Sequence, residues 1–255
     1  MPWDPSQYLK FAGQRLRPAI DLLNRIDVAE PTEVYDLGAG AGNVTRLLKA
    51  RWPNARITGV DESREMLEKA RATAPEITWE RADLATWRPP RPADVIYSNA
   101  ALHWLRDHDR VLPALISTLA PGGVLAVQMP RNFSAPSHTL IADVARSGPW
   151  REKLEPLLRL SPVADPSFYF DLLAPRAAAL DIWEIEYLQV LEGDDPVKEW
   201  VKGTWMNPLL DVLDAADGAR FEKRYAELAA RAYPRRADGR TLFPFRRLFI
   251  VATAG

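Results

Sequence analysis

Short apolar runs alternate with amphipathic helical patterns across residues 30–130, and this alternation constrains the fold more than any other feature of the chain. Residues with helical spacing, such as Val44, Leu47 and Leu48, lie between the runs, and Ser63 has the position of a helix N-cap. Strand and helix following one another in this way predict a parallel sheet with helices on both faces, an α/β fold of the Rossmann-like type. The predicted strands are residues 33–37, 56–60, 77–80, 94–98 and 124–129.

A helix containing Val111 and Leu119 is expected to stop at Pro121-Gly122-Gly123. The regular alternation ends after Pro130, and two further strands are predicted at residues 181–191 and 242–253. We expect one domain over residues 1–255. Its predicted parts are an N-terminal helical lid (1–30), a cofactor-binding core (31–130) and helical insertions (131–180 and 192–240) that cap the substrate site.

Composition narrows the classes of function. The chain has 255 residues, which fits one α/β domain with insertions, and 33 basic against 34 acidic residues give a net charge of −1. Such a balance provides no field for a polyanion, so we expect a small-molecule partner and no nucleic acid. The absence of cysteine excludes disulfides, thiolate metal sites and a cysteine nucleophile. No window approaches the ~20 apolar residues of a membrane span, and the start lacks a signal peptide pattern, so we expect no membrane association and a cytoplasmic location.

The most informative motif is VYDLGAGAG, residues 34–42, in which glycines at 38, 40 and 42 follow a strand ending with an acidic residue. A dinucleotide-binding turn would need its third glycine at 43, where this chain has Asn43, so the spacing argues against a pyrophosphate. S-adenosylmethionine instead has a carboxylate and an ammonium group that must approach the backbone, which Gly38, Gly40 and Gly42 permit. Asp36 is expected to face the ammonium.

Polar residues also follow the next three predicted strands. Asp61, nineteen residues after Gly42, is expected to accept hydrogen bonds from the ribose hydroxyls. Asp83 is expected to bind the exocyclic amine of adenine, and Asn99 and Ala100 to face the reaction site. A purely structural role stays open for each of them; for Asp83 it is the capping of a loop.

These motifs resemble those of a known family. DLGAGAG, GVDES, RADL and LAPGGVL resemble the motifs of class I methyltransferases, over residues 30–130. WDPSQYLKF, RLRPA, NAALHWL, LAVQMPRN and RLFIVAT are similar to segments of the trans-aconitate 2-methyltransferases, over nearly the whole chain. The resemblance implies a class I sheet whose last strand is antiparallel. It also implies transfer of a methyl group from S-adenosylmethionine to a carboxylate of trans-aconitate, giving the monomethyl ester and S-adenosylhomocysteine.

Such a reaction needs little acid–base chemistry. A carboxylate with a pKa near ~4 is ionised at neutral pH, so we predict catalysis by positioning, with no catalytic base and no metal. The other carboxylates of the acceptor need cationic partners, for which Arg247 is the leading candidate, although it could instead be a surface arginine at the start of an edge strand. His103 and His108 are assigned no proton transfer. The further substrate-binding candidates are Tyr8, Phe11 and Arg15, which share one face of a predicted helix, and Trp104 and Trp205, for which packing is the favoured alternative.

Two alternatives remain open at the level of sequence. One is a class I methyltransferase for another small carboxylic acid or a carrier-bound acyl group. The other is a protein that binds S-adenosylmethionine without turnover. The sequence does not determine the oligomeric state.

Overall fold

The structure is a computed structural model that describes residues 12–158 and 161–255, without the side chains of residues 12–15 and 204. Contacts between residues divide the chain into two compact units. The sheet unit consists of Arg15–Pro130, Pro162–Ile185 and Arg247–Gly255. Of the residues that the structure describes, the helical unit contains 12–14, 131–158, Ser161 and Glu186–Arg246.

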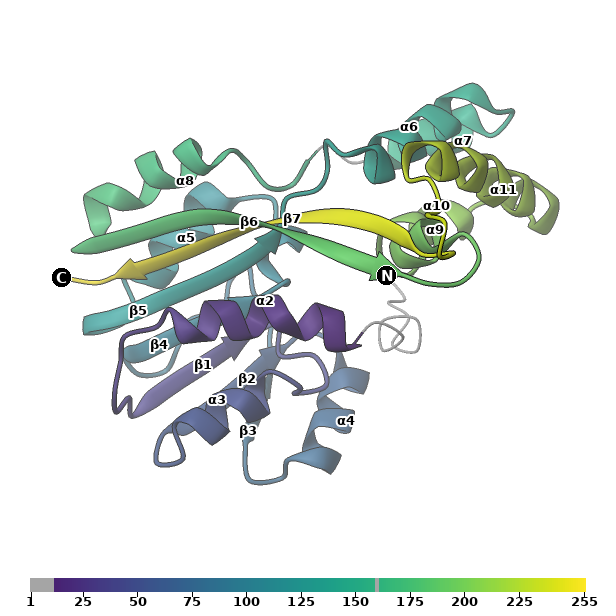
Figure 1. The fold of residues 1–255 in the computed structure, drawn as a ribbon. Helices are drawn as coiled ribbons and strands as arrows, with labels where there is room; N and C mark the ends of the chain where they lie inside the picture. The colour runs from purple at the N-terminus through teal and green to yellow at the C-terminus, as the bar shows by residue number, and fades with distance from the viewer. Residues whose placement is uncertain (1–11, 159–160) are drawn as a thin grey trace. The chain divides into compact units, whose positions relative to one another are not determined.

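A seven-stranded sheet with the order β3-β2-β1-β4-β5-β7-β6 forms the framework (Figure 1). Strands β1 to β5 pair in parallel, as the alternating pattern predicted, and β7 pairs antiparallel to β5, as the resemblance implied. Strands β6 and β7 each continue from one unit into the other. The strand bounds are β1 Glu33–Leu37, β2 Arg56–Asp61, β3 Thr78–Arg81, β4 Ala93–Asn99, β5 Leu119–Pro130, β6 Ala179–Leu191 and β7 Thr241–Thr253.

Helices cover both faces of the sheet in the sheet unit. In Figure 1, α2 and α3 lie in front of the strands and α5 lies behind them. Ser63 caps α4 by accepting a hydrogen bond from the Met66 amide (3.3 Å), and the Tyr97 hydroxyl on β4 donates to the Ala19 carbonyl of α2 (2.8 Å). The elements are α2 Ala12–Asn24, α3 Thr45–Arg51, α4 Arg64–Thr73, η1 Leu102–Trp104, α5 His108–Ile116, α8 Pro166–Leu173 and η3 Ala174–Arg176.

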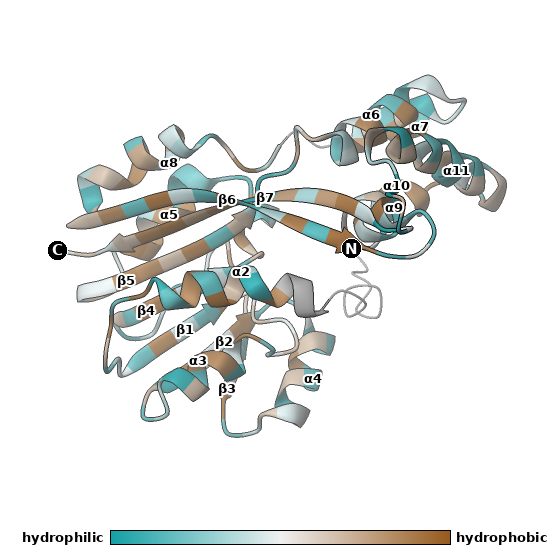
Figure 2. Cartoon of the chain, viewed as in Figure 1, coloured by the Kyte–Doolittle hydropathy of each residue, from teal (hydrophilic) through white to brown (hydrophobic). Residues whose placement is uncertain are grey.

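The burial of the strands follows their place in the sheet. Every residue of β1 is buried, and β5 is buried from Val124 to Met129. Such continuous burial is expected of strands covered on both faces. In β6, at the sheet edge, exposed and covered residues alternate toward its end. Figure 2 shows hydrophilic and hydrophobic residues alternating along this strand. The central strands therefore provide the rigid frame on which the loops after β1, β2 and β4 are held.

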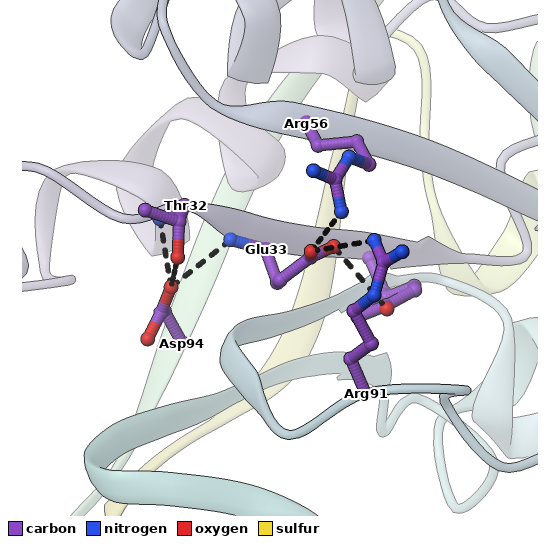
Figure 3. Close-up of polar contacts among 6 residues, drawn as sticks. Thr32, Glu33, Arg56, Arg91 and Asp94 are labelled. Atoms are coloured by element: carbon purple, nitrogen blue, oxygen red, sulfur yellow. Dashed lines mark hydrogen bonds and ion pairs between the residues drawn. The ribbon is translucent and has the colours of Figure 1, made fainter.

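A polar cluster fixes the starts of β1 and β4 (Figure 3). The Asp94 carboxylate accepts hydrogen bonds from the Thr32 amide (2.7 Å), the Thr32 hydroxyl (2.7 Å) and the Glu33 amide (3.0 Å). Burial would raise the pKa of Asp94, but these hydrogen bonds outweigh it and hold the pKa below its ordinary value. Glu33 in turn forms ion pairs with Arg56 and with Arg91 (3.1 Å).

The helical unit has its own apolar core. Trp150, Trp200, Phe221 and Phe243 are among its buried residues. No helix in the described ranges is long and apolar enough to cross a membrane. The elements of this unit, besides its parts of β6 and β7, are α6 Pro136–Ser147, α7 Arg151–Leu154, η2 Glu155–Leu157, α9 Pro196–Val201, the π-helical turn η4 Lys202–Met206, α10 Asn207–Leu210 and α11 Ala215–Ala232.

One predicted boundary was wrong. Helix α5 ends at Ile116, and Pro121-Gly122-Gly123 lies within β5 rather than at a helix end. The segment is held by the C-terminal residues, because the Gly122 amide donates to the Ala254 carbonyl (3.2 Å) and the Ala254 amide donates to the Gly123 carbonyl (2.8 Å).

Candidate active site

The glycine turn after β1 has a positive φ at Gly38, Gly40 and Gly42, of 78°, 56° and 79°. A Cβ on Gly38 would lie 2.0 Å from the Ala101 Cβ, and a Cβ on Gly42 would lie 2.5 Å from the Trp79 ring. Around Gly40, a Cβ would meet nothing within 4 Å among the described residues. Packing therefore explains two of the three glycines, while Gly40 leaves the backbone open to a ligand.

Asp61, at the end of β2, braces this turn. Its Oδ2 accepts a hydrogen bond from the Gly40 amide (2.8 Å), and its Oδ1 accepts one from the Ser63 amide (2.8 Å). Each carboxylate oxygen has a second lone pair, so Asp61 keeps the capacity to accept from a diol.

Asp36 is buried beneath the same turn, with 2% of its surface exposed. Its Oδ2 accepts a hydrogen bond from the Thr45 hydroxyl at the start of α3 (2.6 Å). Burial raises the pKa of Asp36 to about 7; the Thr45 hydrogen bond opposes this shift, and the charge of Asp61 adds to it. A cation placed beside Asp36 would therefore favour its ionised form.

Asp83 is exposed in the loop after β3. Its Oδ1 accepts a hydrogen bond from the Ala85 amide (2.9 Å), which is the contact expected of a residue that caps a loop. The geometry fits the structural alternative for this residue, and contact with adenine stays a prediction.

The loop after β4 is strained where it meets the glycine turn. Ala100 has a φ of 53°, unusual for a residue with a side chain, and its amide donates to the Gln128 carbonyl (2.9 Å). Because Gly38 has no Cβ, there is room beside it for Ala101, the residue that follows Ala100. The ends of β1 and β4 thus come together, and backbone strain at such a point is characteristic of functional sites.

Arg247 is buried, with 6% of its surface exposed, and lies on β7 between β5 and β6. Its Nη1 donates to Oε1 of Gln128, the fully buried glutamine of β5 (3.2 Å). The alternative of a surface arginine on an edge strand was wrong, because β7 is an inner strand. Burying a guanidinium is costly unless an anion or acceptors accompany it, and the Gln128 oxygen is one such acceptor.

His103 and Gln128 are residues that sequence reasoning did not assign to the site. His103 is buried in η1 and packs on the Trp104 ring at a centroid distance of 4.6 Å. Burial, followed by the charge of Arg247, lowers the pKa of His103 to about 3, so the imidazole is neutral at physiological pH. The available signal for Gln128 was an amide within the otherwise apolar run VLAVQM, where a polar side chain needs a specific partner.

The remaining candidates are less informative. Trp104 is 39% exposed in the sheet unit. Trp205 belongs to the helical unit, where its ring lies 4.9 Å from that of Phe133 and 5.5 Å from that of His138, and it lines a cavity of about 390 Å³. The predictions for Tyr8 and Phe11 lie outside the described residues, and so does the side chain of Arg15.

Two solved structures have the same fold. An S-adenosylmethionine-dependent methyltransferase from Mesorhizobium loti matches with a TM-score of 0.53 and 23% identity, over 95% of this chain and 99% of that protein. Phosphoethanolamine N-methyltransferase 2 from Haemonchus contortus, in complex with S-adenosyl-L-methionine, matches with a TM-score of 0.53 and 15% identity. That match covers 94% of this chain, which spans only about half (53%) of the Haemonchus protein.

The methyltransferase domain family model matches residues 34–123, which include the glycine turn, Asp61 and Asn99. Sheet order, antiparallel β7 and this match define a class I methyltransferase. Trans-aconitate 2-methyltransferases are similar over almost the full length: that of Azoarcus sp. is 46% identical over 98% of both chains, and that of Streptomyces avermitilis is 48% identical over 98% of this chain and 96% of the relative. The chain therefore belongs to the trans-aconitate 2-methyltransferase family, as the resemblance of its motifs predicted.

Proposed function

We propose that this protein transfers a methyl group from S-adenosyl-L-methionine to a carboxylate of trans-aconitate, giving the monomethyl ester and S-adenosyl-L-homocysteine. Family membership supports the reaction, and the observation that carries the acceptor class is the burial of Arg247 beside Gln128. A fixed guanidinium in a largely dry environment selects an anion with planar oxygens.

The residues of the glycine turn fit the cofactor. The open space at Gly40 supports assigning the methionyl part to it, and we assign the ammonium to the buried Asp36 and the ribose hydroxyls to Asp61, which accepts from the Gly40 amide. Asn99 has a buried Oδ1 that finds no hydrogen-bond partner in the described part of the chain, and this orphaned acceptor fits a ligand at the end of β4. Asp83 is proposed for the adenine amine. When bound, the cofactor supplies an activated methyl group on a sulfonium.

The protein's contribution to the reaction is placement. The acceptor carboxylate is already ionised at neutral pH, and its oxygen needs to be held in line with the methyl carbon and the sulfur. His103 is neutral and is needed neither as a base nor as an acid. Well-oriented intramolecular reactions gain roughly 7–11 kcal/mol from such positioning, which is the scale of help available without proton transfer.

A methyl-transfer assay with labelled cofactor over a panel of di- and tricarboxylates tests the proposal. We expect the labelled ester to form with trans-aconitate and kcat/KM to be higher than for the shorter acids. Ester formation with another acid alone would make the protein a methyltransferase for a different small carboxylate, and no ester at all would refute the proposed reaction.

A matched pair of arginine variants tests the acceptor site. Arg247→Ala is expected to raise the KM for trans-aconitate by about 100-fold, because a hydrogen-bonded charge pair is lost, with little effect on the KM for the cofactor. The control is Arg246→Ala, since Arg246 is the exposed neighbour of Arg247 on β7. Equal increases in both KM values for Arg247→Ala would exclude it from the acceptor site.

A further inference from the structure

The Gln128 amide is oriented by Arg247. Its Oε1 accepts the Arg247 Nη1 hydrogen bond (3.2 Å), which directs the NH₂ group away from the guanidinium. Nε2 is buried and has no hydrogen-bond partner among the residues that the structure describes. A buried amide with two unused donors is uncommon and indicates that a ligand or a water completes the site.

His103 presents a second buried nitrogen. Its Nδ1 also has no hydrogen-bond partner within the described ranges. The residue before it is fixed, because His108 Nε2 bonds to the Leu102 carbonyl (2.9 Å) and His108 Nδ1 bonds to the Tyr169 hydroxyl (2.7 Å). With Nε2 of His108 donating to the carbonyl, Nδ1 accepts from Tyr169, and the turn that carries His103 is held by this chain of hydrogen bonds.

These nitrogens lie on neighbouring elements of the sheet unit. Asn99, the last residue of β4, pairs in register with Gln128 on β5, and His103 follows in η1. The turn η1, which carries His103, is in contact with β5, which carries Gln128, and the charge of Arg247 lowers the pKa of His103. Among the described side chains, Arg247 is also the only buried lysine or arginine. The set thus combines one cation with two neutral nitrogen sites.

We propose that Gln128 Nε2 and His103 Nδ1, together with the Arg247 guanidinium, bind the acceptor carboxylate that is not methylated; this rests on the proposed function. A carboxylate bound by a guanidinium and two N–H donors is stabilised as an anion, so its oxygens are weaker nucleophiles than those of a free carboxylate. The group held there is therefore the anchor, and a second carboxylate of the same acceptor attacks the methyl group. Asn99 Oδ1 is an acceptor and is excluded from this set. Gln128 and His103 are specificity-determining residues that favour di- and tricarboxylates over monocarboxylates.

Variants of Gln128 test the anchor. Gln128→Leu removes the donors at similar size and is expected to raise the KM for trans-aconitate about 10-fold, while the Kd for S-adenosylhomocysteine stays within about 2-fold. Gln128→Glu places a carboxylate against Arg247 and should raise the acceptor KM further, by about 100-fold. Gln189→Leu is the matched control, because Gln189 is a buried glutamine on the part of β6 that belongs to the helical unit.

Two variants of His103 identify the nitrogen that is used. The amide of Asn can replace Nδ1 and the amide of Gln can replace Nε2, so His103→Asn should keep the acceptor KM within about 3-fold, whereas His103→Gln should raise it about 10-fold. Unchanged acceptor KM values in Gln128→Leu and His103→Gln, with wild-type affinity for S-adenosylhomocysteine, would overturn the inference. The proposed function would then still stand, because the wild type would methylate trans-aconitate.

A binding measurement distinguishes failure of the proposed function from failure of the proposed carboxylate anchor. Calorimetric titration of trans-aconitate into the complex with S-adenosylhomocysteine should show binding that Gln128→Leu weakens. Such binding without any methyl transfer would refute the proposed function and keep the anchor. The absence of binding to the wild-type complex would overturn the anchor as well.

Discussion

The three glycines of the turn after β1 serve different purposes at the scale of single residues. Gly38 and Gly42 have both a positive φ and a close neighbour, Ala101 and Trp79 respectively, whereas Gly40 has a positive φ and open space. The sequence motif presents them as equivalent. The structure therefore separates the glycine required for packing the turn from the glycine beside which a ligand can approach.

Alanine substitution at Gly38 and at Gly40 should lower stability to different extents. Gly40→Ala adds only backbone strain, so we expect a loss of about 1 kcal/mol in the free energy of unfolding and an affinity for S-adenosylhomocysteine at least ~10-fold weaker. Gly38→Ala adds the same strain and a clash with Ala101, so the loss of stability should be larger, about 3 kcal/mol. Urea denaturation and calorimetric titration measure the two quantities.

The double variant Gly38→Ala/Ala101→Gly provides the control, because it removes the clash and keeps the strain. It should recover part of the stability lost in Gly38→Ala. Wild-type affinity for S-adenosylhomocysteine in Gly40→Ala would mean that the cofactor does not approach the backbone at Gly40.

At the scale of elements, the two ends of β1 and β4 have separate roles. Their starts are joined by Asp94, Thr32 and Glu33, whereas their ends hold the glycine turn and the Asn99–Ala101 segment. Four residues of β4, Val95 to Ser98, separate Asp94 from Asn99. Stability and ligand binding can therefore be changed independently in these strands.

Asp94→Ala should weaken the fold and leave the chemistry unchanged. The loss of three hydrogen bonds to a partly exposed carboxylate is expected to lower the free energy of unfolding by about 2 kcal/mol at pH 7. Because the folded-state pKa of Asp94 is lowered, its contribution is present above the ordinary pKa of 3.8 and is lost as the pH falls through the folded-state value. The difference between wild type and variant, measured by urea denaturation, should therefore narrow toward acid pH.

The kcat of Asp94→Ala should stay within about 2-fold of the wild type at 25 °C, because the carboxylate lies at the far ends of the strands from the site. Asp94→Asn keeps an acceptor oxygen, so its stability should lie between those of the wild type and Asp94→Ala. A stability difference that is the same at pH 7 and at pH 2, below the ordinary pKa of 3.8, would contradict the assigned role of the charge.

How far the sequence predicted the elements depended on how local their causes are. The strands β1, β2 and β4 and the cap at Ser63 follow from neighbouring residues, and the predictions were confirmed within one residue at most ends. The start of β5 was misplaced because Gly122 and Gly123 bond to Ala254, which is distant in sequence. The same holds for the site: the glycine turn could be predicted from spacing, but the burial of Arg247 depends on Gln128, which is 119 residues away.

The dependence on pH belongs to the whole molecule, since folding, cofactor binding and catalysis each respond to different groups. Acceptor carboxylates are ionised above pH ~5, and His103 is neutral because burial and Arg247 lower its pKa to about 3. We therefore expect kcat to be constant from pH 6 to pH 8. Asp36, with its pKa raised to about 7 by burial, titrates within this range and should govern stability and cofactor affinity instead.

The effect on stability has a definite sign. The pKa of Asp36 is higher in the folded protein than its ordinary value of 3.8, so the folded state retains a proton that the unfolded chain has lost. The stabilisation is fully present below pH 3.8 and is lost as the pH rises through about 7, by up to about 1.4 kcal/mol per pH unit. Asp36→Asn, which keeps an acceptor for the Thr45 hydroxyl, should remove this slope and be the more stable protein at pH 8.

Cofactor binding should respond to Asp36 in the opposite direction. If the ammonium pairs with the ionised carboxylate, binding of S-adenosylhomocysteine expels the proton, and the affinity of the wild type rises between pH 5.5 and pH 7.5. Asp36→Asn should bind more weakly, by about 10-fold at pH 7.5, with an affinity that no longer depends on pH over this range. Calorimetry in two buffers of different ionisation enthalpy would measure the released proton directly. Release of the same number of protons by wild type and Asp36→Asn would show that another group titrates, and the ammonium would then have to be placed away from Asp36.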